Sequence, residues 1–126
     1  MCEALVLDYA GVLTDPDAAD LLAVVSALRK RGIRTALLSN AGSGEGVKRG
    51  LAAYFDAFVF SGEVGFAKPS TEVYRLTAER LGVSTVDCVF VDDVHANVAG
   101  AVAVGMVGVH HVSVAATLAE LNALFV

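Results

Sequence analysis

Short apolar runs alternate with longer amphipathic segments along the whole chain. Five of these runs are nearly free of charge and end at polar or turn residues, which is typical of strands buried on both faces of a sheet. They predict strands at residues 4–7, 33–38, 57–60, 88–91 and 106–109.

The segments between these runs carry apolar residues at helical spacing. The first is predicted to begin with Asp15 as N-cap and Pro16 at the first helical position, and to end at Gly32 after three basic residues. Residues 61–67 are predicted to form a glycine-containing loop. Further helices are predicted at 47–54, 71–81, 95–104 and 116–125.

The alternation of strand and helix predicts the fold class. Such an order favours an α/β, three-layer, Rossmann-like fold with a mostly parallel five-stranded sheet and right-handed crossovers. No linker or repeat interrupts the pattern, and 126 residues suffice for one core, so a single domain spanning 1–126 is expected. The order of the strands in the sheet does not follow from the pattern.

Composition narrows the possible partners. Hydrophobic residues make up 56% of the chain and the mean hydropathy is +0.63, yet charges interrupt every apolar block, so no membrane span is predicted. A net charge of −5 argues against nucleic acid as a partner. Cys2 and Cys88 lack metal spacing and are expected to be buried, reduced thiols in a cytoplasmic protein. The high apolar content leaves surface for self-association, and a two-fold homodimer is expected.

Four polar sites follow strands or loops that one parallel sheet would bring to a common edge. Asp8 follows the first strand, and the other three are Ser39-Asn40, Lys68 before Pro69, and Asp92-Asp93. Each of these sites, taken alone, can be explained by structure without function, as a helix cap, a turn or a solvated loop charge. Together they are more informative, because adjacent carboxylates repel each other unless a cation neutralises them. A hard divalent ion such as Mg²⁺ suits Asp8 with the Asp92-Asp93 pair.

In this order, the acid, the hydroxyl, the lysine and the acid pair resemble the haloacid dehalogenase (HAD) superfamily of hydrolases, and the Asp-x-x-Gly-Val-Leu form is nearest to its epoxide-hydrolase-like and dehalogenase-like branch. The resemblance covers essentially the whole chain and is most specific in the stretch from Val91 to Ala101. It implies that Asp8 is the nucleophile that becomes phosphorylated. It also implies that Lys68 neutralises the nucleophile and the phosphate, and that Ser39 and Asn40 hold the phosphoryl oxygens.

The same resemblance implies a magnesium site. Asp8 and Asp93 would bind the ion directly, Asp92 would bind it through water, and the backbone carbonyl of Ala10 would be a further ligand. Asn97 would brace the loop that carries the acid pair.

Two features depart from the family pattern. Residues 9–38 and 40–67, where cap domains are inserted in relatives, are each needed for a crossover, so the chain is expected to lack a cap. Ala10 stands where most phosphatases of the family carry a second aspartate that acts as general acid and base. Dehalogenase-type relatives also lack that acid but use a cap to build a dry pocket, so a capless chain argues against dehalogenation.

Two functions from different classes remain open. The first is a Mg²⁺-dependent phosphatase acting on a phosphorylated small molecule or macromolecule, weakened by Ala10, with His95 as a candidate substitute base. The second is a non-catalytic module that binds phosphate and Mg²⁺ for regulation or interaction. A phospho-acceptor receiver domain also fits the length and the acid-rich α/β pattern, but receivers place the acid pair after the first strand and the lysine after the last. Here the acid pair comes late and the lysine precedes it, which argues against a receiver.

Overall fold

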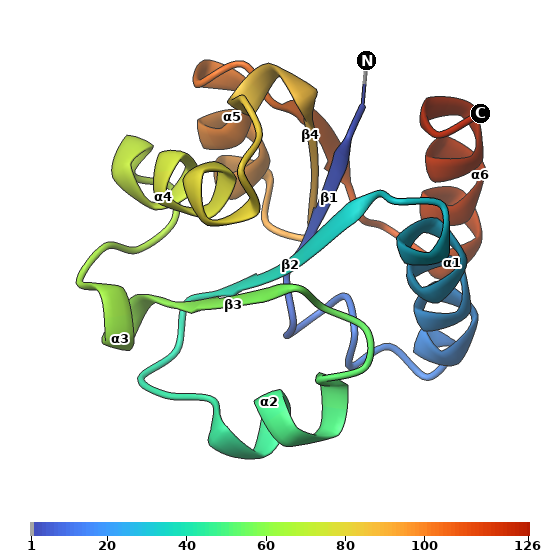
Figure 1. Ribbon diagram of the computed structural model, residues 1–126, viewed down its shortest axis with the longest axis horizontal. Coiled ribbons are helices and arrows are strands. Elements are labelled where there is room, and N and C mark those ends of the chain that lie inside the picture. The colour runs from blue at the N-terminus through green and yellow to red at the C-terminus, as the bar shows by residue number, and fades with distance from the viewer. Residues whose placement is uncertain (1) are drawn as a thin grey trace.

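The computed structural model describes residues 2–126 and contains one parallel five-stranded sheet (Figure 1). Its strands lie in the order β3-β2-β1-β4-β5, so the first strand is central and the chain winds outward in both directions. The strands are β1 (Ala4–Leu7), β2 (Arg34–Ser39), β3 (Ala57–Phe60), β4 (Cys88–Asp92) and β5 (Val107–His110). The predicted mostly parallel α/β fold with five strands is confirmed.

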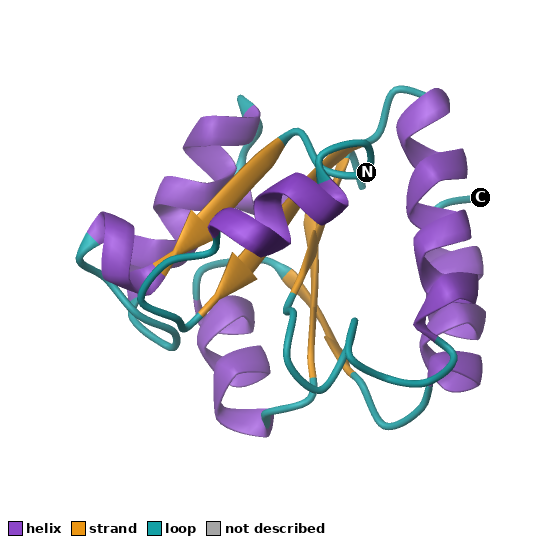
Figure 2. Ribbon diagram, turned by 90° about the horizontal axis from the view of Figure 1, so that it is seen from below, coloured by secondary structure: helices purple, strands orange, loops and turns teal. Residues whose placement is uncertain are grey.

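Helices cover both faces of the sheet and make a three-layer structure (Figure 2). One face carries α1 and α6, which pack against each other, and the opposite face carries α4 and α5. The short helix α3 contacts β3, and the short helix α2 lies in the connection between β2 and β3. The helices are α1 (Ala18–Lys30), α2 (Glu45–Leu51), α3 (Ser61–Val64), α4 (Thr71–Leu81), α5 (His95–Ala103) and α6 (Val114–Leu124), with a 3-10 turn η1 (Thr85–Asp87).

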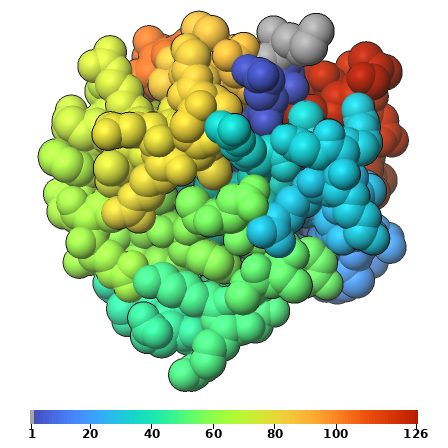
Figure 3. All heavy atoms as spheres, in the orientation of Figure 1, coloured from blue at the N-terminus to red at the C-terminus, as the bar shows by residue number. Residues whose placement is uncertain are grey.

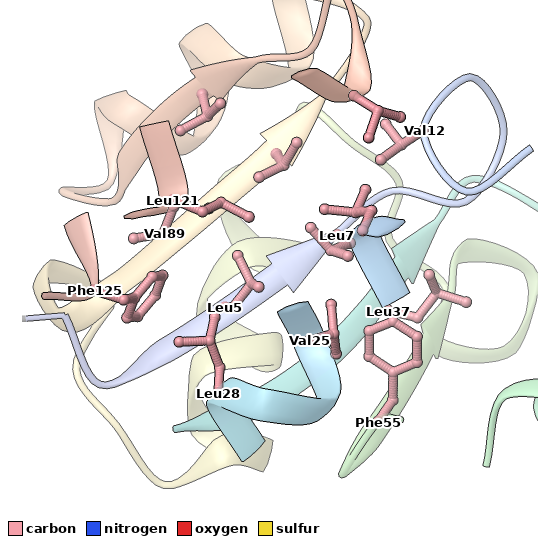
Figure 4. Packing of buried hydrophobic residues seen from close by; sticks show 14 of the residues in the cluster. Leu5, Leu7, Val12, Val25, Leu28, Leu37, Phe55, Val89, Leu121 and Phe125 are labelled. Carbon is pink, nitrogen blue, oxygen red and sulfur yellow. The ribbon is translucent and has the colours of Figure 1, made fainter. Parts of the chain in front are cut away.

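The alternation of side chains along β1 divides the interior into two cores. Leu5 and Leu7 point to the α1/α6 face and pack with residues such as Leu121 (Figure 4). Ala4 and Val6 point to the α4/α5 face, into a second core that includes Tyr74. All four β1 side chains are fully buried, which explains why the strand needs no polar position.

The beginning of α1 differs from the sequence prediction. The helix begins at Ala18, and Asp15 makes no helix cap, because its Oδ1 accepts a hydrogen bond from the Asp17 backbone N–H in a turn. Residues 9–17 are held by turns, including two hydrogen bonds from the Val12 and Leu13 N–H groups to the Tyr9 carbonyl. The predicted loop at 61–67 contains the helical turn α3, which ends at Gly65.

The crossovers are short in the described part of the chain. Between β1 and β2 lies only α1 with its preceding turns, and between β2 and β3 only α2, so residues 2–126 contain no inserted cap. None of the described helices is long and apolar enough to cross a membrane. Cys2 and Cys88 are both free thiols. Cys88 is buried as expected, whereas Cys2 is only partly buried.

Candidate active site

The carboxyl ends of three neighbouring strands bring the predicted polar residues together. Leu7 lies in register with Leu37 on one side and Val91 on the other, so the residues that follow these strands meet at one edge of the sheet. A pocket of about 330 Å³ opens there. Its lining residues are Asp8, Ala10, Gly11, Ser39, Asn40, Lys68, Asp93, Val94 and Asn97.

The Lys68 ammonium group is the centre of this site. Its Nζ donates to Asp8 Oδ1 and to Asp92 Oδ2, both at 2.8 Å, and to the Leu38 carbonyl at 3.0 Å. All three N–H groups of the lysine are thereby used. Lys68 is 5% exposed, Asp8 6% and Asp92 0%, so these are buried charges held by mutual pairing.

Asn40 fixes the loop that carries Lys68. Its side-chain Nδ2 donates to the Lys68 carbonyl at 3.0 Å, and its Oδ1 accepts from the Lys68 N–H at 2.9 Å. The end of β2 therefore holds the backbone of a residue 28 positions further along the chain. The Ser39 hydroxyl, beside it, lines the pocket and has no hydrogen-bond partner within residues 2–126.

A second set of hydrogen bonds, from Val94 and Asn97, holds the Asp92 carboxylate in place. Asp92 Oδ1 accepts from the Val94 N–H at 2.9 Å, and Oδ2 accepts from Asn97 Nδ2 at 3.2 Å. The Tyr74 hydroxyl in turn donates to the Asn97 carbonyl at 2.6 Å. Burial, with the negative charge of Asp92, raises the pKa of Tyr74, so its hydroxyl remains a donor.

Three carboxylates are close enough to share a cation. Oxygen atoms of Asp8, Asp92 and Asp93 all lie within 4.8 Å of one another. Gly11, with φ of +82°, lies so close to Asp93 that a Cβ there would overlap the carboxylate. This all-oxygen set fits a hard divalent ion such as Mg²⁺.

Burial changes the acidity of Asp8 in the metal-free protein. It raises the pKa of this carboxyl to about 6, although the charge and hydrogen bond of Lys68 act to lower it. The nearby Asp92 carboxylate raises it further. A bound cation would reverse this shift by stabilising the carboxylate.

The candidate base His95 contacts a residue of β5 and does not line this pocket. Its ring packs edge-on against His110, with 5.6 Å between the ring centroids, and His95 is not among the lining residues. Ala10 is exposed at the pocket and contributes only a methyl group and its backbone. Among the lining residues, no histidine or further acid takes the place of the aspartate that Ala10 lacks.

Sequence reasoning missed three supporting residues. Tyr74 lies on α4 at a spacing that indicates only core packing, and His110 follows a strand without a motif. His110 Nε2 lies 2.9 Å from the Asp93 carbonyl oxygen and fixes the acid loop from β5. Gly11 was visible as a glycine three positions after an acid, but its contact with Asp93 joins residues 82 positions apart and required the fold.

The lysine-bridged acid pair thus lies at the carboxyl edge of a parallel sheet covered by helices on both faces. A model of the haloacid dehalogenase-like hydrolase family matches residues 2–105. The chain therefore belongs to the haloacid dehalogenase-like hydrolases.

The chain is also similar to individual proteins. A crystal structure of an uncharacterized protein from Corynebacterium glutamicum is 34% identical, with a TM-score of 0.92, and covers 99% of this chain and 96% of that one. Phosphatase MT3486 of Mycobacterium tuberculosis is 34% identical over 110 residues, which cover 82% of this chain and 49% of the relative. Mouse bifunctional epoxide hydrolase 2 is 30% identical over 110 residues, covering 81% of this chain and 20% of that protein. The chain thus spans half or less of the length of these two curated relatives.

Proposed function

We propose that this protein is a Mg²⁺-dependent phosphatase that forms an aspartyl-phosphate on Asp8. The observation that carries the proposal is the Lys68 ammonium group, which bridges Asp8 and Asp92 at 2.8 Å each, beside an open pocket with the Ser39 hydroxyl on its wall. The name of the Mycobacterium tuberculosis relative, a phosphatase, supports a phosphate ester as the substrate class.

The first chemical step uses Asp8 as nucleophile. Its free carboxylate oxygen attacks phosphorus, the bond from phosphorus to the leaving oxygen breaks, and that oxygen takes its proton from water. Lys68 holds the other Asp8 oxygen and so orients the carboxylate. The Ser39 hydroxyl and the Asn40 backbone N–H donate to the phosphoryl oxygens, since the Asn40 side chain is already used by the Lys68 backbone.

Hydrolysis of the aspartyl-phosphate is the second step. Water attacks phosphorus, the bond to the Asp8 oxygen breaks, and phosphate leaves with the carboxylate restored. Asp8, Asp92, Asp93 and the Ala10 carbonyl would hold Mg²⁺, which when bound neutralises the charge of the phosphoryl group. Asn97 and Tyr74 position Asp92 for this role.

Ala10 makes the second step the slower one. General acid–base catalysis typically contributes about 10²–10⁴-fold, and Ala10 offers no group that could protonate a leaving group or activate water. Aryl phosphates need little help in the first step because their leaving groups are weak bases. Burst kinetics with aryl phosphates are therefore expected.

The same residue favours a second candidate, a phosphate- and Mg²⁺-binding module without turnover. Measurement of phosphate release from an aryl phosphate, with and without Mg²⁺, separates the two. The phosphatase predicts Mg²⁺-dependent release that Asp8→Asn abolishes and Ala10→Asp accelerates. Wild-type protein that binds Mg²⁺ but shows neither burst nor turnover would support the binding module.

A further inference from the structure

A second hollow lies beside the catalytic pocket and differs from it in chemistry. It has a volume of about 300 Å³ and none of its lining residues is charged. It is formed by the loop after β1, by α1 and by α2, and we call it the apolar groove. Its lining residues are Tyr9, Leu13, Leu22, Gly46, Val47, Gly50 and Leu51.

One loop separates the apolar groove from the catalytic pocket. Asp8, Ala10 and Gly11 line the pocket, whereas Tyr9 and Leu13 of the same loop line the groove. The Leu13 N–H donates to the Tyr9 carbonyl at 2.8 Å, which brings these two groove residues together in one turn. Ala10, in the same loop, is exposed at the catalytic pocket and adds no charge there.

The outer wall of the groove is α2, which projects from one end of the molecule (Figures 1 and 3). None of its residues is buried, and Val47 and Leu51 are only partly covered by the core. A Cβ built at Gly46 or Gly50 meets no other atom within 4 Å. The space around both of these glycines, which line the groove, is therefore open.

We propose that the apolar groove binds the hydrocarbon part of a phosphate monoester whose phosphoryl group lies at Asp8. This inference rests on the proposed phosphatase function and names its substrate class, monoesters of long aliphatic or aryl alcohols. A sugar or nucleotide ester would place hydroxyl or charged groups in a hollow that offers, apart from the Tyr9 hydroxyl, no polar side chain to bind them.

The test compares alkyl phosphates from methyl to octyl, each below its critical micelle concentration. Full burial of a methylene group corresponds to about a four-fold gain in affinity, so kcat/KM should rise two- to four-fold per methylene until the groove is filled. Gly50→Leu should flatten this dependence on chain length, because the new side chain occupies the groove. The helix tolerates the change, since leucine favours helix more than glycine does.

Ala52→Leu is the matched control. It adds the same side chain at the end of the same helix, at an exposed position outside the groove lining, so the chain-length dependence should persist. Equal kcat/KM for methyl and octyl phosphate in the wild-type protein would overturn the inference and leave the phosphatase function intact.

A binding experiment separates the two proposals. Octyl phosphonate, which the enzyme cannot hydrolyse, should shift the backbone amide NMR signals of Tyr9, Leu13 and Val47, whereas methyl phosphonate should not. If these shifts occur but the protein hydrolyses no phosphate ester, the ligand-binding role of the groove is supported and the phosphatase function is overturned. Absence of these shifts would overturn the proposal that the groove binds the hydrocarbon chain. Shifts that depend on protein concentration instead of ligand would also overturn it, because they would assign the groove to a second copy of the chain.

Discussion

Replacement of Lys68 by methionine tests the charge arrangement on which the site depends. Methionine has a similar length and an unbranched chain, so Lys68→Met removes the positive charge and its three hydrogen bonds while keeping most of the packing. Asp8 and Asp92 are then left buried without their cation. Loss of one partner from a buried ion pair costs about 3–5 kcal/mol, because the remaining charge is uncompensated.

This cost converts into a large change in melting temperature. For 126 residues, an unfolding entropy of about 2.1 cal/mol/K per residue means that each kcal/mol lowers Tm by about 4 °C. The variant should therefore melt about 11–19 °C below the wild-type protein at pH 7.5 without metal. Loss of Lys68 raises the folded-state pKa of Asp8 above the value of about 6. Lys68→Met should therefore destabilise the protein fully at a pH above this raised pKa. The destabilisation should decline as the pH falls through that pKa and the Asp8 carboxyl takes up a proton.

Differential scanning calorimetry at pH 7.5 and pH 5, with and without Mg²⁺, measures these effects. Mg²⁺ should recover more stability in Lys68→Met than in wild type, because it supplies the missing positive charge. Lys48→Met is the control, since Lys48 pairs with Glu63 at the surface and exposed pairs contribute little. A Lys68→Met variant that melts no lower than Lys48→Met at pH 7.5 would refute the assigned role of the buried pairs.

Three further perturbations test other parts of the account. Tyr74→Phe should cost about 1–3 kcal/mol in urea unfolding, because a buried carbonyl loses its donor. Gly11→Ala should weaken Mg²⁺ binding, measured by calorimetric titration, because the new Cβ displaces the Asp93 carboxylate. Burial raises the pKa of Cys88 to about 11, so at pH 8 iodoacetamide should modify Cys2 alone in the native protein and both thiols after unfolding.

Each of these outcomes has a clear opposite. A Tyr74→Phe variant as stable as wild type would show that water replaces the tyrosine hydroxyl. Unchanged Mg²⁺ affinity in Gly11→Ala would place the ion away from Asp93. Rapid alkylation of Cys88 in the folded protein would contradict its burial.

The raised pKa of Cys88 also makes stability depend on pH. Because the folded-state pKa of this thiol lies above the unfolded one, its contribution to stability is complete below about pH 8.5 and is lost as the pH rises towards 11.

The sequence predicted the positions of the strands well, because the pattern of hydrophobic residues is enough to determine them. All five strands form within one residue of their predicted ends, because each is a buried apolar run bounded by polar or turn residues. The predicted start of α1 was wrong: an aspartate followed by proline is a common helix start, but here local backbone hydrogen bonds hold residues 9–17 in turns next to the site. The helical turn α3 contains only four residues, too few for a periodicity to be visible.

The sequence predicted that the candidate site residues would lie together, but it did not predict the hydrogen bonds among them. The convergence of Asp8, Lys68 and Asp93 at one pocket agrees with the expectation from parallel strand ends. The double hydrogen bond between Asn40 and the Lys68 backbone could not be predicted, because it joins two loops whose separation depends on strand order. The ring contact between His95 and His110 depends on the position of β5 in the same way, and His95 is not among the residues that line the pocket.

Covalent trapping of the intermediate tests the central claim most directly. Wild-type protein mixed with an aryl phosphate and Mg²⁺, quenched in acid and digested, should yield one phosphorylated peptide in mass spectrometry, with the phosphoryl group on Asp8. Ala10→Asp should lower the trapped fraction by accelerating its hydrolysis, and Asp8→Asn should yield none. Steady release of phosphate by Asp8→Asn, with no phosphorylated peptide from the wild-type protein, would contradict the account.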